Sequence, residues 1–106
     1  MLNMVEWAIK EGFIHEGANR EIKAFVMVKQ KYYDYLFSFS KHDIKLTSLR
    51  RADYEYEKEI ACVKYGFNFD HAMSLYLMYR REEFEKEREL KRIKDYINSK
   101  EEGTPV

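Results

Sequence analysis

The sequence predicts an all-α protein: a small four-helix domain whose last helix is long and partly projects from the rest. Three observations favour this fold class. Apolar residues recur every three or four positions, the 4 Gly and 1 Pro fall mostly near the ends of these periodic segments, and 45% hydrophobic residues in a chain of 106 supply one core. We therefore expect a single helical domain over residues 1–99 and a frayed tail over residues 100–106.

The first two helices are predicted from their caps and spacing. Asn3 is followed three residues later by Glu6, which is typical of a capping box, and the first helix is predicted over 4–11. The second helix is predicted over about 20–38, with Asn19 as its cap. Its apolar stripe comprises Ile22, Phe25, Val28, Tyr32, Tyr35, Leu36 and Phe39. A β-hairpin is the alternative here, because the segment is rich in β-favouring residues, but no turn signal interrupts it.

The third helix shows the clearest amphipathic pattern in the chain. Thr47 or Ser48 is expected to cap it, and Gly66 is expected to end it in a left-handed conformation. The stripe predicted to face the core comprises Leu49, Ala52, Tyr56, Ile60 and Val63, with Phe67 as a further candidate. Since Tyr54 and Tyr56 are two residues apart, both cannot point inward, and this stripe leaves Tyr54 on the surface.

The fourth helix is predicted to begin at Asn68 or Asp70 and to run without a breaker to about residue 99. Residues 72–79 are apolar nearly all the way round, whereas residues 80–94 are charged nearly all the way round. On the helix face that residues 72–79 occupy, the next residues are charged: Glu82, Glu83 and Lys86. Burying these charges without partners would cost several kcal/mol. The same face becomes apolar again only beyond them. The helix is therefore expected to leave the core near Arg80.

Beyond this point the helix carries a second apolar stripe of Leu90, Ile93 and Ile97. This stripe either folds back onto the first helix or binds something else, namely a second copy of the chain or another protein. The charged positions between the two stripes are otherwise typical of a solvated helix with i,i+4 pairs such as Glu82–Lys86.

No pattern of catalytic or metal-binding residues is present in the sequence. His15, His42 and His71 lack partners at a recognised ligand spacing, and there is no Gly-rich phosphate loop. Cys62 lies near glutamates on the third helix, whose negative charge disfavours the thiolate that a nucleophile needs. We therefore expect no enzyme activity, no catalytic residue, no metal and no cofactor.

Charge and segment patterns bear on location and partners. The 19 Lys+Arg balance the 19 Asp+Glu, so the chain has no overall attraction for nucleic acid. No apolar run approaches the ~20 residues that span a bilayer, the first residues do not resemble a secretory signal, and a lone cysteine makes no internal disulfide. We expect a cytoplasmic protein that does not contact membranes.

The function predicted from these features is binding to another protein, as an adaptor, an inhibitor or a mobile-element accessory protein, with a homodimer as one use of the C-terminal stripe. Aromatic residues make up 16% of the chain, more than a small helical core can hide, and exposed Tyr is enriched at protein interfaces. The residues predicted to bind protein are Tyr32, Tyr33, Tyr35, Tyr54, Phe84, Leu90, Ile93 and Ile97.

A second group of candidates is basic: Lys41, Lys45, Arg50 and Arg51, with Arg80 and Arg81 in the fourth helix. These side chains are expected to contact an acidic partner or a nucleic-acid backbone, unless Arg50–Asp53 and Arg51–Glu55 pairs simply neutralise them. The alternative function is a helix-turn-helix-like DNA-binding transcriptional regulator that uses residues 60–79 and this basic group. Its would-be reading face, residues 68–74, contains no Lys or Arg, so nucleic acid is the less favoured partner.

Overall fold

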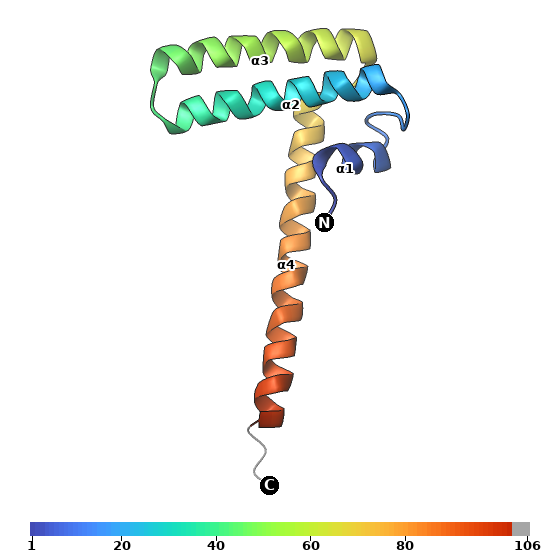
Figure 1. Ribbon diagram of the computed structural model, residues 1–106, viewed down its shortest axis with the longest axis vertical. Helices are drawn as coiled ribbons and strands as arrows, with labels where there is room; N and C mark the ends of the chain where they lie inside the picture. The colour runs from blue at the N-terminus through green and yellow to red at the C-terminus, as the bar shows by residue number, and fades with distance from the viewer. Residues whose placement is uncertain (103–106) are drawn as a thin grey trace.

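The computed structural model describes residues 1–102, which form four helices and no strand: α1 (Met4–Lys10), α2 (Asn19–Ser40), α3 (Ile44–Tyr65) and α4 (Phe69–Glu102). Helices α2 and α3 lie side by side as an antiparallel hairpin, and α4 runs away from it as the stem of a T, with α1 beside its first half (Figure 1). The all-α prediction is confirmed, and residues 20–38 are helical rather than a β-hairpin.

The helix starts follow from side-chain caps. The Asn3 side-chain oxygen accepts a hydrogen bond from the Glu6 backbone N–H at 2.9 Å, which confirms Asn3 as the cap of α1. The Glu6 carboxylate accepts from the Asn3 side-chain amide and not from the Asn3 backbone N–H, so the reciprocal bond of a capping box is replaced by a side-chain contact. Helix α2 begins one residue earlier than expected, with Ala18 at the cap position. Helix α3 begins at Ile44, because the Asp43 carboxylate accepts a hydrogen bond from the Leu46 backbone N–H at 3.0 Å. The cap predicted at Thr47 or Ser48 is therefore wrong.

The helix ends also differ in part from the prediction. Gly66 ends α3 with φ 79°, the left-handed conformation expected from the sequence. The Asn68 side chain then accepts a hydrogen bond from the His71 backbone N–H at 3.1 Å, so α4 begins where it was predicted to begin. Helix α4 is assigned to Glu102, a few residues beyond the predicted end near residue 99, and residues 103–106 of the expected tail lie outside the described residues.

The core lies where the four helices meet, and it is largely aromatic. The Phe25 ring of α2 packs at 5.4 Å from the Phe67 ring and at 5.3 Å from the Phe69 ring, while Trp7 of α1 packs at 5.4 Å from Tyr76 of α4. Each such side chain contributes roughly 1.5–3 kcal/mol when it is fully buried. The core therefore fixes the start of α4 against the hairpin and fixes α1 against α4.

Helix α3 faces the core with a different side from the one predicted. Tyr54 and Ala61 are each only 3% exposed, whereas Tyr56 is 63% and Val63 is 83% exposed. At 100° per residue these two exposed side chains lie about 160–180° round the helix from Tyr54. The hairpin is covered on one face only, and Tyr54 is favoured there because its hydroxyl finds a partner on α4. The predicted core stripe is therefore an exposed stripe, apart from Phe67, which is buried.

The second half of α4 leaves the core as predicted. Glu82 and Lys86 are exposed and Glu83 is half-buried, so these charges do not lie inside the fold. The stripe of Leu90, Ile93 and Ile97 is 48–59% exposed and does not fold back onto α1, which sits beside the first half of α4 (Figure 1). Residues 80–100, called the arm below, therefore form a helical segment that extends away from the core.

Candidate functional site

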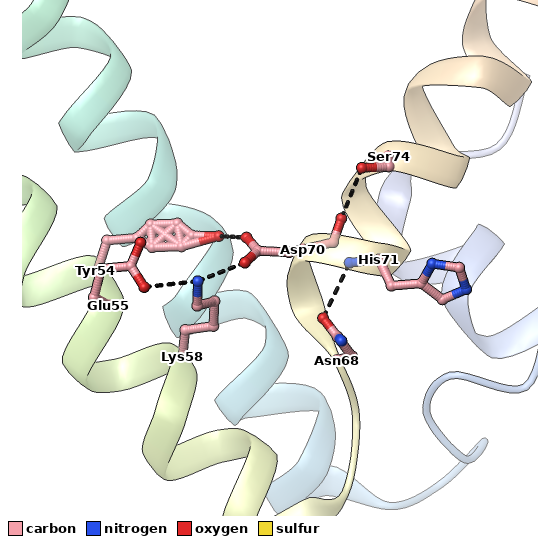
Figure 2. Close-up of polar contacts among 7 residues, drawn as sticks. All are labelled: Tyr54, Glu55, Lys58, Asn68, Asp70, His71 and Ser74. Carbon is pink, nitrogen blue, oxygen red and sulfur yellow. Dashed lines mark hydrogen bonds and ion pairs between the residues drawn. The ribbon is translucent and has the colours of Figure 1, made fainter.

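A polar cluster joins α3 to the first turn of α4 (Figure 2). The Tyr54 hydroxyl donates a hydrogen bond to one oxygen of the Asp70 carboxylate at 2.6 Å, and the Lys58 ammonium donates to the other oxygen at 2.5 Å. The same ammonium lies 2.7 Å from the Glu55 carboxylate, one turn earlier on α3. Both carboxylate oxygens of Asp70 are thus held from α3, which orients α4 relative to the hairpin.

The protonation states in this cluster are those of a structural contact. Burial raises the pKa of Tyr54 far above its ordinary value, and the hydrogen bond to Asp70 raises it further. Burial alone would raise the pKa of Asp70, but hydrogen bonds from Lys58 and Tyr54 outweigh it and lower that pKa. Burial would likewise lower the pKa of Lys58, but hydrogen bonds to Asp70 and Glu55 raise it. All three pKa values are shifted away from pH 7, whereas a general acid or base needs a pKa near the working pH.

Five exposed apolar side chains lie on either side of the turn that ends the α2–α3 hairpin. Figure 1 shows that α4 crosses the hairpin away from this end, so none of the other described helices packs against it. Phe37 and Phe39 are 65% and 64% exposed, and Ile44 is 82% exposed just after the connecting turn. Because Phe37 and Phe39 lie about 160° apart round α2, the end of the hairpin is apolar on more than one side. The hairpin tip, as we name it, comprises Leu36, Phe37, Phe39, Ile44 and Leu46.

The four basic candidates of the hairpin surround this tip. The Lys41 ammonium lies 5.3 Å from the centre of the Phe37 ring, a cation–π contact. Lys45, Arg50 and Arg51 are exposed on the first turns of α3. The Arg50–Asp53 and Arg51–Glu55 pairs considered from the sequence do not form. The Asp53 carboxylate instead lies 2.7 Å from the Lys31 ammonium, and Glu55 pairs with Lys58. The hairpin tip therefore combines apolar side chains with positive charge.

The exposed stripe of α3 continues from this tip along the outer face of the hairpin, on the side away from α4. It comprises Leu49, Ala52, Tyr56, Ile60 and Val63. Ile60 also lines a shallow open groove between α3 and α2, together with Met27. Arg20, Lys23, Lys64 and Glu57 border the same groove, and Glu59 lies beside Tyr56 and Val63 on the outer face. The outer face thus repeats the apolar character of the hairpin tip but carries charges of both signs.

The predicted tyrosines are divided by the structure. Tyr33 is exposed, while Tyr32 and Tyr35 are half-buried with their rings 5.3 Å and 6.4 Å from the Tyr54 ring. Tyr54 itself is buried, so its prediction as a surface contact is wrong: the phenol fills the space between α3 and α4 and donates to Asp70. Tyr33 is the one of these four that lies on the surface.

The predicted arm residues lie far from the hairpin tip. Phe84, Leu90, Ile93 and Ile97 are exposed along the arm. Arg80 packs its guanidinium 5.9 Å from the centre of the Tyr76 ring, and the Arg81 Nε lies 3.3 Å from the Glu85 carboxylate. The structure does not bring these residues together with Lys41, Lys45, Arg50 and Arg51.

Sequence reasoning missed most of the hairpin tip. The sequence pattern predicts no role for Phe37, Ile44 and Leu46, and it places Leu36 and Phe39 in the apolar stripe of α2. The available signal was their density on either side of a short turn, since residues 36–39 and 44–46 contain five large apolar side chains. A hairpin end that overhangs the rest of a small domain has nothing to pack against.

The described residues offer no metal site and no membrane span. No three side chains among His, Cys, Asp and Glu gather where they could hold a metal ion in the described part of the chain. No helix among those described combines the length and the apolar character needed to cross a bilayer.

Comparison with known proteins identifies no similar family, protein or structure. The chain matches no protein-family model, and searches of curated proteins and of solved structures return no match.

Proposed function

We propose that this chain is a non-enzymatic protein that binds another protein through the hairpin tip and the adjoining outer face of α3. The observation that carries the proposal is the hairpin tip itself, where three large apolar side chains are more than 60% exposed. Aromatic and aliphatic side chains held on a rigid helical hairpin lose little conformational freedom on binding, which favours their use as anchors.

The charge around the hairpin tip indicates the chemistry of the partner. Between residues 36 and 51 there are four cationic side chains and a single carboxylate, that of Asp43, which caps α3. An acidic surface with apolar side chains of its own would match both features, because opposite charges speed association and apolar contacts supply affinity. We therefore propose an acidic, amphipathic protein segment as the partner.

Photo-crosslinking tests this proposal directly. A photoreactive phenylalanine at Phe39 should capture a partner protein in the native host, with crosslinked peptides rich in Asp and Glu. The same group at Gln30, an exposed α2 position away from the tip, should not capture it. Capture at Phe39 should fall when Lys45 and Arg51 are both changed to Glu. Equal capture at Gln30, or capture that ignores the charge change, would contradict the proposal.

The alternative of a DNA-binding regulator gains no favourable observation. Phe69 and Met73, on the would-be reading face, are buried in the core. The basic residues Lys45, Arg50 and Arg51 lie in the first half of α3, about 14–32 Å along the helix from residues 60–66 at ~1.5 Å per residue. Binding to random duplex DNA that weakens steeply with salt would support this alternative in place of our proposal.

A further inference from the structure

The arm carries an apolar seam of its own, separate from the hairpin surface. Leu90, Ile93 and Ile97 share one face of α4 and are each about half exposed. Their spacing of three and four residues continues with Glu83 and Lys86 on one side and Lys100 on the other, which is the repeat of a coiled coil. We propose that this seam pairs with the same seam of a second copy of the chain, with the two arms antiparallel.

The charged residues that continue the repeat of the seam, Glu83, Lys86 and Lys100, favour antiparallel over parallel pairing. Parallel arms would place Glu83 against Glu83 and Lys86 against Lys86 of the second copy, two repulsive layers. Antiparallel arms with Leu90 facing Ile93 of the second copy place Glu83 opposite Lys100, which are opposite in charge. The same register places Lys86 opposite Ile97, where the lysine stem can cover the aliphatic side chain while its ammonium reaches water.

The charges that flank the seam favour the same direction. Glu87 and Lys94 lie on one flank of the seam, and the antiparallel register sets each of them opposite the other on the second copy, twice by symmetry. More broadly, residues 80–89 carry four cations and five carboxylates, whereas residues 90–100 carry four cations and one carboxylate. Antiparallel arms therefore set the more acidic half of one against the more basic half of the other.

The length of the seam also fits this register. The Leu2 backbone N–H donates to the Tyr79 hydroxyl at 2.9 Å, and the Tyr76 hydroxyl donates to the Leu2 carbonyl at 3.2 Å, so the N-terminal segment covers this face of α4 as far as Tyr79. With Leu90 facing Ile93, the helix end at Glu102 of the second copy lies opposite Arg81. The arm of the second copy thus covers the seam face of α4 down to about Arg81, next to the part that the N-terminal segment covers.

The expected association is weak, because the apolar part of the seam is small. Three aliphatic side chains about half exposed, with the stems of their charged neighbours, would bury less than the ~1,200 Å² at the low end of stable interfaces. We therefore expect a dissociation constant on the order of 10–500 μM, which sedimentation equilibrium on the full chain can measure at low salt.

Charge exchange provides the decisive test. Glu87→Lys and Lys94→Glu should each weaken self-association about 10-fold, because each creates two like-charged pairs across the dimer. An equimolar mixture of the two variants should associate as the unchanged chain does, since every flank pair is then opposite in charge. Asp95→Lys, on the far face of α4 and with the same change in charge as Glu87→Lys, is the matched control and should leave association unchanged.

Apolar substitutions and concentration complete the test. Leu90→Glu with Ile93→Glu should abolish self-association while leaving the far-UV circular dichroism of the monomer in place. A chain that remains monomeric at about 500 μM would overturn the proposal. A dimer whose mixture of charge variants associates no better than either variant alone would overturn the antiparallel register. Because the hairpin tip is untouched by these variants, loss of arm pairing leaves partner capture at Phe39 as a separate result.

Discussion

Tyr54 and Tyr56 provide a matched pair of substitutions that tests how α3 is oriented. The two residues are identical in type and two positions apart, but Tyr54 is 3% exposed and Tyr56 is 63% exposed. Replacing a buried aromatic side chain by Ala costs about 3–5 kcal/mol, so Tyr54→Ala should remove a large part of the ~5–15 kcal/mol by which a small domain is stable. Replacing the exposed Tyr56 by Ala should change the free energy of unfolding by less than about 0.5 kcal/mol.

The hydrogen bond of Tyr54 adds little to this difference. Tyr54→Ala leaves Asp70 without its 2.6 Å donor, but the Asp70 side chain is 58% exposed and keeps its bond to Lys58. Water can therefore replace the phenol, and most of the loss comes from the cavity left by the ring.

Urea unfolding followed by circular dichroism measures both variants. With a slope of about 2 kcal/mol per molar urea, Tyr54→Ala should lower the midpoint by about 2 M and Tyr56→Ala by less than about 0.3 M. The protein should be kept at or below a few micromolar so that self-association does not contribute. Equal losses for the two variants, or a larger loss for Tyr56→Ala, would show that α3 faces the core with the stripe predicted from the sequence.

Four further predictions concern the junction, the turn and the arm. In a double-mutant cycle, Tyr54→Phe and Asp70→Ala should show a coupling of about 0.5–1 kcal/mol by urea unfolding, small because the Asp70 side chain is 58% exposed. A coupling of zero would contradict the contact in Figure 2. The pKa of Asp70 is lowered in the folded state. The ionised carboxylate therefore stabilises the fold above its ordinary pKa of about 3.9, and this stabilisation is lost as the pH falls through the lowered pKa. Asp70→Asn should therefore make the free energy of unfolding fall less steeply in acid. Gly66→Ala should cost about 1 kcal/mol by thermal or urea unfolding, since φ is 79° there, and an unchanged midpoint would argue against the left-handed cap. Removing residues 90–106 should leave the free energy of unfolding within about 0.5 kcal/mol at micromolar protein, whereas a larger loss would show that these residues pack on the core.

The helices could be predicted from the sequence because their signals are local. The cap at Asn3 and the left-handed Gly66 depend on neighbours within a few residues, and both are confirmed. The departure of α4 from the core was also predictable, because burying Glu82 and Lys86 would be too costly in any arrangement. Those inferences need no knowledge of how the helices are arranged in space.

The orientation of α3 could not be predicted, because it depends on which other helix covers it. The stripe around Tyr56 is as good a core face by spacing as the side around Tyr54. The choice is made by α4, whose Asp70 offers the Tyr54 hydroxyl a partner and whose Phe69 packs 6.0 Å from the Tyr54 ring. The hairpin tip escaped prediction for a related reason: nothing in the sequence shows that α4 crosses the hairpin away from its end.

Whether the fold leaves the apolar hairpin tip uncovered is tested most directly by thiol accessibility. In a Cys62→Ser background, single cysteines at Phe39 and at the buried Ala61 should be labelled with a soluble thiol reagent at sub-micromolar protein. A thiol at position 39 should react nearly as fast as in unfolded protein, and a thiol at position 61 should react at least 100-fold more slowly. Similar slow rates at both positions would mean that the tip is packed inside the fold, and the proposed binding surface would not exist.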